Sequence, residues 1–168
     1  MEPLQDVLQG REGRVRAQDR LLKAGLTVIQ VSLNIPGFPK RLKNDLFCIE
    51  KTSWLVRERC LSLGWKILRE VGLLNGAGYA VLLGAGPGAD PKRLKEACLV
   101  LEETLSWGRA IDLDVRDHRG IIGRGILGIP PRRCLLCGQE AKHCSREGRH
   151  DRRQLRKIVE ELLENCAP

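Results

Sequence analysis

Two aspartates separated by one residue are the first candidates for chemistry in this sequence. Asp112 and Asp114 lie in the run 109–116 (RAIDLDVR), where apolar and polar residues alternate. Because side chains two residues apart on a strand project from one face, the two carboxylates would share a surface. Close carboxylates repel each other unless a cation lies between them, and Mg²⁺ prefers carboxylate oxygens together with phosphate oxygens of a substrate. The pair therefore suits phosphoryl or nucleotidyl transfer, the alternative being two solvated aspartates on an exposed strand face.

A second group of residues has the composition of a zinc site. The spacing C-x2-C-x6-C-x5-H is formed by Cys134, Cys137, Cys144 and His150. Three thiolates and one imidazole can close a tetrahedral zinc site, and His143 can replace His150 as the fourth ligand. The alternative is a set of reduced thiols in a loop. The other cysteines are expected to behave as small apolar residues on helices: Cys48, Cys60, Cys98 and Cys166.

Basic residues are concentrated around these cysteines. The segment 132–157 holds nine basic residues against three acidic ones, so it carries most of the net charge of the chain. Arginine suits phosphate because its planar guanidinium can donate two parallel hydrogen bonds. Arg132 and Arg133, between Pro131 and Cys134, are the better candidates for a positioned phosphate site. For Arg152, Arg153, Arg156 and Lys157 a solvated helix face is an equal alternative.

The sequence contains neither a glycine-rich phosphate-binding loop nor a serine nucleophile motif. The five glycines between residues 76 and 88 lack both the G-x4-G-K-[ST] signature and a G-x-G-x-x-G between strand and helix, so we interpret them as turn residues. The sequence also has no serine-centred nucleophile elbow, and hydrolase chemistry of that type has no support.

Length and composition are typical of one compact domain, which we expect to span residues 1–168 with a Cys/His/Arg-rich segment at 132–150. The chain has 168 residues, 42% of them hydrophobic and 30% charged, and a net charge of +8 that favours anionic partners. The opening residues lack a secretory signal pattern, and no apolar run approaches the length of a membrane span. We therefore expect a cytoplasmic protein with reduced cysteines and no membrane partner.

The apolar periodicity predicts the elements that must position these residues. They are helical turns over 4–25 interrupted near Gly10 and Gly13, a strand at 26–35, a helix at 40–63, hairpin strands at 65–71 and 79–83, a helix at 90–105 capped by Asp90, a strand at 109–116 with a hairpin partner at 120–127, and a helix at 152–164 capped by Asp151. This order predicts an α+β fold with a mixed or antiparallel sheet of four to five strands in ferredoxin-like βαββαβ order. Two helices would cover one face of the sheet, and further helices would stand at the N- and C-terminal ends of the chain.

The candidate site residues, taken in chain order, resemble those of a known family. The run 107–115 (WGRAIDLDV), the run 129–137 (IPPRRCLLC) and then Ala141, Cys144, Arg146 and His150 are similar to the citrate lyase holo-acyl-carrier-protein synthases, the phosphoribosyl-dephospho-CoA transferases. The resemblance extends to Arg11, Glu12, Arg14 and Gln18 and to the strand that ends at Pro36-Gly37, so it covers nearly the whole chain. Departures are small: Ala110 and Ile111 replace bulkier residues, and Gly13 interrupts the N-terminal motif.

The resemblance implies transfer of a phosphoribosyl-dephospho-CoA group from its triphosphoribosyl precursor to a serine of the apo acyl carrier protein subunit of citrate lyase, with release of pyrophosphate. Asp112 and Asp114 would then be catalytic and hold Mg²⁺. The triphosphate would be bound by Arg11, Arg14, Arg109, Arg132 and Arg133. Carrier proteins are usually acidic, so the basic segment 142–157 is the expected docking surface.

Two other functions remain open at this level. A related nucleotidyltransferase would load another carrier, such as that of malonate decarboxylase. A zinc-containing nucleic-acid-binding module is the alternative from a different class. Two Phe, three Trp and one Tyr are few for base stacking, which argues against a nucleic-acid partner.

Overall fold

The computed structural model of the chain describes residues 3–166, and these residues form an antiparallel five-strand sheet with helices on both faces. The elements in order are α1 (Pro3–Lys23), β1 (Thr27–Leu33), α2 (Asp45–Ser62), β2 (Ile67–Asn75), β3 (Gly78–Ala85), α3 (Pro91–Thr104), β4 (Ile111–Asp117), β5 (Gly120–Ile122), the 3₁₀ helix η1 (Arg124–Leu127), α4 (Ala141–Glu147) and α5 (Arg152–Glu164). The predicted α+β class is confirmed.

The strand order in the sheet is β2-β3-β1-β4-β5, and every neighbouring pair is antiparallel. The helix α2 connects β1 to β2, two strands that have β3 between them. Similarly, α3 connects β3 to β4, which have β1 between them. Each crossover is therefore split by one strand, as in the predicted βαββαβ order, and β5 is added at the β4 edge.

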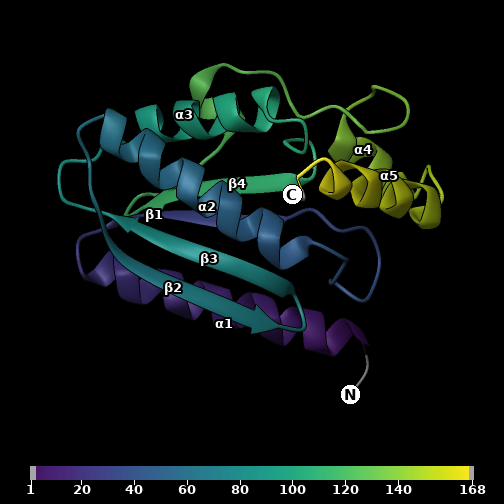
Figure 1. Cartoon of the computed structure of the whole chain (residues 1–168), viewed down its shortest axis with the longest axis horizontal. Helices are drawn as coiled ribbons and strands as arrows, with labels where there is room; N and C mark the ends of the chain where they lie inside the picture. The colour runs from purple at the N-terminus through teal and green to yellow at the C-terminus, as the bar shows by residue number, and fades with distance from the viewer. Residues whose placement is uncertain (1–2, 167–168) are drawn as a thin grey trace.

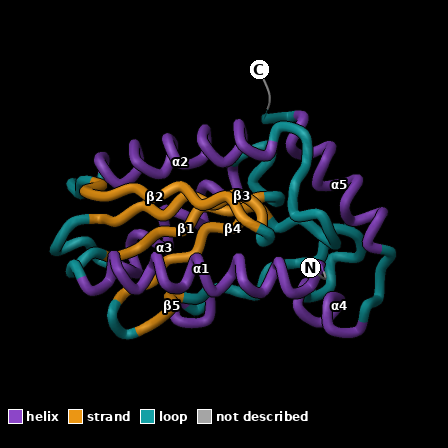
Figure 2. The backbone as a smooth tube through the Cα atoms, turned by 90° about the horizontal axis from the view of Figure 1, so that it is seen from below, coloured by secondary structure: helices purple, strands orange, loops and turns teal. Residues whose placement is uncertain are grey.

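The sheet separates two apolar layers. Figure 1 shows α2 and α3 over one face, and Figure 2 shows the strands between α2 and α1. Side chains such as Ile29, Val81 and Leu113 pack toward α2 and α3, whereas Val28 and Leu82 pack against α1. The short helix α4 and the helix α5 lie together at one end of the sheet (Figure 1).

The sequence prediction was wrong about the first helix, which is continuous instead of interrupted near Gly10 and Gly13. Gly10 faces the turn between β2 and β3, and the amide of Asn75 donates a hydrogen bond of 3.2 Å to its carbonyl oxygen. A Cβ at Gly10 would lie 2.4 Å from Asn75 Oδ1. The glycine thus permits close packing of helix on hairpin and does not break the helix.

The partner of β4 also differs from the prediction, because β5 ends at Ile122 and residues 124–127 form η1 instead of continuing the strand. The cap predictions for α3 and α5 are confirmed. Asp90 accepts hydrogen bonds from the backbone of Lys92 and Arg93, and Asp151 accepts one from Arg153. Among residues 3–166, no helix combines the length and the apolar character that a bilayer crossing requires.

Candidate active site and metal cluster

Asp112 and Asp114 lie on the same face of β4, as their spacing predicted. Ile111, Leu113 and Val115 alternate with them and are fully buried on the opposite face. In the register with β1, Ser32 lies opposite Asp112 and Gln30 lies opposite Asp114. The two carboxylates are therefore part of a polar strip on the sheet face that α1 covers elsewhere.

The two aspartates have different environments. Asp112 keeps 45% of its side chain exposed. Burial, together with the neighbouring charges of Asp112 and Glu102, raises the pKa of Asp114 to about 6 against the opposing effects of Lys95 and Arg132. Two carboxylates that repel each other when both are ionised are stabilised by a cation bound between them.

Side chains close the outer edge of β4 where β5 does not reach it. Glu102 accepts a hydrogen bond of 3.0 Å from the backbone N–H of Leu113, and Lys95 donates one to the carbonyl oxygen of the same residue. Arg132 donates a hydrogen bond of 3.1 Å to the carbonyl oxygen of Ile111. The backbone on both sides of Asp112 is thereby fixed by α3 and by the loop after η1.

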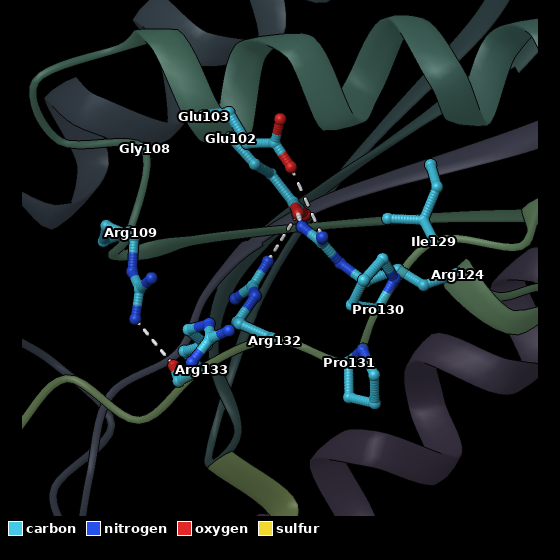
Figure 3. A pocket seen from close by; sticks show the side chains of 10 residues that line it. All are labelled: Glu102, Glu103, Gly108, Arg109, Arg124, Ile129, Pro130, Pro131, Arg132 and Arg133. Atoms are coloured by element: carbon cyan, nitrogen blue, oxygen red, sulfur yellow. Dashed lines mark hydrogen bonds and ion pairs between the residues drawn. The ribbon is translucent and has the colours of Figure 1, made fainter. Parts of the chain in front are cut away.

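Arg132 also connects the acidic strand to a buried carboxylate. Its guanidinium lies 2.7 Å from Glu102 Oε2, a contact drawn in Figure 3. It also lies 3.7 Å from Asp112 Oδ1. Arg124 contacts the same Glu102 oxygen at 3.0 Å. Burial lowers the pKa of Arg132, but the three carboxylates Glu102, Asp112 and Asp114 outweigh it and raise the pKa, so Arg132 is a permanent cation beside the pair. Sequence reasoning missed Glu102 and Arg124, because nothing in their spacing separates them from an ordinary amphipathic helix and loop.

A cavity of about 320 Å³, here called the basic cavity, lies where β1 ends and β4 begins. Its cationic lining residues are Arg11, Lys40, Arg109, Arg132, Arg133 and Arg152. None of the described residues that line it is an aspartate or a glutamate. A second cavity of about 250 Å³ shares Arg109, Arg132 and Arg133 with it and extends toward Glu102 (Figure 3). Such a concentration of guanidinium groups is suited to a polyanion.

Lys40 is a residue of this cavity that sequence reasoning did not select. Its ammonium group donates a hydrogen bond of 2.5 Å to the carbonyl oxygen of Ile35, two residues after β1. Burial lowers the pKa of Lys40, and the positive charges of Arg11, Arg156 and Arg152 lower it further. An anion in the cavity would relieve this repulsion. Its place directly after the Pro36–Pro39 turn at a strand end is the sequence signal that could have identified it.

The structure brings together four of the five arginines expected to bind substrate. Arg11, Arg109, Arg132 and Arg133 line the basic cavity. Arg14 does not, because its guanidinium is turned to the hairpin turn and donates to the carbonyl oxygens of Ala77 at 2.7 Å and Gly78 at 3.2 Å. Arg14 therefore fixes α1 to the sheet. Its Nε is buried without a hydrogen-bond partner among the described residues.

The candidate zinc ligands converge on one point. One ligand atom from each of Cys134, Cys137, Cys144 and His150 lies within 4.8 Å of the other three. The sulfurs of Cys137 and Cys144 are 3.4 Å apart, and His150 Nε2 is 3.2 Å from the Cys137 sulfur. Ligand atoms of a tetrahedral Zn²⁺ with sulfur and nitrogen donors are separated by about 3.3–3.8 Å. These four residues, here called the Cys3His cluster, can therefore hold a metal ion such as zinc.

Other residues of the same segment have different roles. His143 is 3.1 Å from Glu147 on α4 and does not join the cluster, so His150 is the histidine that does. Arg156 donates to the carbonyl oxygens of Pro36, Pro39 and Arg41 and thereby holds α5 against the turn after β1. The remaining cysteines are buried in the core as expected, at Cys48, Cys60, Cys98 and Cys166.

Comparison with known proteins defines a transferase. The family profile described as apo-citrate lyase phosphoribosyl-dephospho-CoA transferase matches residues 2–166, and the chain belongs to this family. It is 33% identical over 162 residues to a probable apo-citrate lyase phosphoribosyl-dephospho-CoA transferase of Vibrio cholerae serotype O1, covering 95% of this chain and 90% of that protein. A relative of the same name in Streptococcus pyogenes serotype M18 is 33% identical over 168 residues, covering 95% of this chain and 84% of the relative.

Proposed function

We propose that the chain transfers the 5′-phosphoribosyl-dephospho-CoA group from its triphosphoribosyl precursor to a serine of the apo acyl carrier protein of citrate lyase. In this step the serine oxygen forms a bond to the phosphorus nearest the ribose. The bond from that phosphorus to the next bridging oxygen breaks, pyrophosphate leaves, and the serine proton passes to a base or to solvent. The proposal rests on the family to which the chain belongs and on one observation, the contact of Arg132 with both Asp112 and the basic cavity.

The basic cavity supplies the charge that a triphosphate needs. Its six cations can bind the phosphate oxygens and neutralise the charge that accumulates on the leaving pyrophosphate. Arg132 and Arg109 lie at the end of the cavity near the start of β4, whereas Lys40 and Arg152 line it from the turn after β1 and from α5. We infer that the reacting phosphate lies near Arg132 and that the two leaving phosphates lie deeper in the cavity.

Asp112 and Asp114 fit a magnesium site. They present two carboxylates on one strand face, and a Mg²⁺ ion is usually bound through one or two carboxylates and the oxygens of substrate phosphates. When bound, such an ion neutralises charge on the transferring phosphate. The strand fixes both side chains, and Glu102 and Arg132 hold the backbone around them. The carboxylates thus need little rearrangement to receive a substrate whose phosphates bring the cation.

The Cys3His cluster is proposed to hold zinc in a structural role. Three thiolates and one imidazole complete a closed tetrahedral set, which leaves no open position for a substrate. Backbone N–H groups of Leu136 and Cys137 also interact with the sulfur of Cys134, as expected for a thiolate ligand. Zinc content of the purified protein tests this assignment. A protein expressed with zinc that carries no stoichiometric metal would contradict it.

The docking surface for an acidic carrier is proposed to be the exposed part of α4 and α5. Lys142 and Arg146 on α4 and Arg153 on α5 are exposed beside the residues that line the basic cavity. Arg156, expected from the sequence to contribute, is engaged with backbone carbonyls instead. Attraction by the remaining cations would accelerate encounter at low salt and weaken as salt increases.

Transfer can be tested directly by mass spectrometry. The protein is incubated with Mg²⁺, the triphosphoribosyl precursor and the apo carrier protein of citrate lyase. The carrier should gain the mass of the prosthetic group on a serine, and pyrophosphate should form in equal amount. A carrier with that serine replaced by alanine is the control. Modification of a malonate decarboxylase carrier in preference to the citrate lyase carrier would contradict the proposed partner.

A further inference from the structure

The Cys3His cluster and the basic cavity share one wall. We propose that metal bound by the cluster braces the basic cavity, so that the metal determines how tightly the cavity binds pyrophosphate. The inference rests on the proposed function, because it treats the cavity as the site of the leaving pyrophosphate. Beyond the structural role proposed above, the metal would then strengthen anion binding in the cavity.

Three members of the cluster line the cavity themselves. Cys134, Cys144 and His150 are among its lining residues, whereas Cys137 is not. Because Cys137 does not line the cavity, a substitution there can alter the cavity only through the other ligands or through the metal that they share.

The ligands also lie next to the cations along the chain. Arg133 directly precedes Cys134, and Arg152 follows His150 after one residue. A metal that joins Cys134 to His150 therefore joins the loop carrying Arg132 and Arg133 to the first turn of α5. Preorganised cations bind an anion more tightly than mobile ones, because less conformational freedom is lost on binding.

The segment that carries the cluster has almost no apolar core of its own. In residues 132–151 the buried side chains are those of Cys134 and Cys144, both of them cluster members. Its other anchors are the contact of Arg132 with Glu102, the partly buried Leu135 against the core, and backbone hydrogen bonds such as Ala141 N–H to the carbonyl oxygen of Arg132 at 2.8 Å. Metal coordination commonly replaces an apolar core in small irregular segments. We infer that it does so here.

The positive charge of the cavity opposes close approach of its walls. Arg11 of α1, Lys40 of the turn after β1 and Arg152 of α5 all line the same cavity. Their mutual repulsion favours an open cavity in the absence of an anion. Coordination of one metal by Cys134 and His150, at the two ends of the segment, opposes that opening.

Calorimetric titration with inorganic pyrophosphate in excess Mg²⁺ tests the proposal. Zinc-loaded wild type, chelator-treated wild type and the Cys137→Ser variant are compared, and zinc is measured after each titration because pyrophosphate itself binds zinc. We expect affinity to fall at least about tenfold in the chelator-treated protein and in Cys137→Ser. Zinc addition should restore the treated wild type. The matched control is His143→Ala, which removes an exposed histidine of the same segment outside the cluster.

Far-UV circular dichroism and thermal unfolding establish that the sheet and helices remain folded in each sample. Equal pyrophosphate affinity with and without zinc, in folded protein, would overturn the brace. Absence of pyrophosphate binding to zinc-loaded wild type would overturn the cavity assignment on which it depends. Zinc-dependent pyrophosphate binding in a protein that fails to modify the carrier would support the brace and contradict only the proposed transfer function.

Discussion

The acidic strand and the basic cavity meet at Arg132, but different kinds of structure build them. β4 carries Asp112 and Asp114 within an antiparallel sheet whose apolar face is fully buried. The cavity is lined mainly by the loops at 34–40 and 129–140, by α4 and by the first turn of α5. The first region is fixed by the core, whereas the second depends on ion pairs, backbone contacts and, in our proposal, a metal. Substitutions in the two regions should therefore produce different kinds of defect.

The largest effect is expected at the acidic strand. Asp112→Asn and Asp114→Asn should each lower kcat for carrier modification by about 10²–10³-fold, because an electrostatic contact to the reacting phosphate is lost. Both variants should fold, since the amide occupies the same volume on a polar face. Carrier mass measured against time gives kcat. Asp19→Asn on α1, which removes an ion-pair partner of Arg116 and leaves both β4 carboxylates in place, is the control. Wild-type turnover by either β4 variant would exclude that residue from the mechanism.

Substitutions in the basic cavity should act on substrate binding. Lys40→Gln and Arg152→Gln should each raise KM for the triphosphoribosyl precursor by about tenfold, because each removes a charged hydrogen-bond donor to phosphate. The unfolding temperature should change little. Arg153→Gln, at the next position of α5 and outside the cavity lining, should leave KM near that of the wild type. If Lys40→Gln and Arg152→Gln had the same KM for the precursor as Arg153→Gln, the precursor would not use this cavity.

The pKa of Asp114 predicts a pH dependence of stability. Its value of about 6 lies above the ordinary 3.8, so the folded protein binds this proton more tightly than the unfolded chain does. The resulting stability is present below about pH 4 and is lost as pH rises through about 6. Asp114→Asn lacks this titration, so its stability relative to wild type should increase between about pH 4.5 and about pH 7.5. Urea unfolding without Mg²⁺ at the two pH values measures the change. A constant difference would contradict the raised pKa.

The smallest effects concern the helix that packs beside the acidic face. Gly10→Ala should destabilise the protein by about 1–3 kcal/mol, because its Cβ would lie 2.4 Å from Asn75 Oδ1 and 2.6 Å from the backbone nitrogen of Ala77. Gly13→Ala should stabilise it by up to about 1 kcal/mol, since the nearest atom is 3.8 Å from the new Cβ. Denaturant unfolding of the pair tests both signs. Equal destabilisation would show that α1 tolerates neither methyl group.

Much of the acidic strand could be predicted from sequence because its signals are local. Alternation in 109–116 predicted both the strand observed at Ile111–Asp117 and the common face of the two aspartates, and Asp90 with Pro91 predicted the start of α3. The cysteine spacing likewise indicated which side chains could converge on a metal. Helical continuity through Gly10 was missed, since the packing of that glycine on Asn75 is a contact between residues 65 positions apart.

The basic cavity could be predicted only in part because residues from distant elements form it. Arg109, Arg132 and Arg133 were selected through motifs, but the direction of Arg14 depends on the turn between β2 and β3. Lys40 enters the cavity because the chain turns back after β1 and its ammonium group is held by Ile35. Glu102 resembles any acidic residue on a helix until the edge of β4 is seen to need an acceptor.

The way in which the outer edge of β4 is closed affects whether the sheet can be extended. Where the peptide groups of an edge strand are satisfied by another strand, the sheet continues outward; at Ile111 and Leu113 three side chains take that role instead. The sheet therefore stops one strand short beside Asp112. Because Lys95 and Glu102 are buried while they satisfy these peptide groups, this edge offers no free backbone groups to a strand from another molecule, and growth of the sheet by edge-to-edge pairing is blocked here.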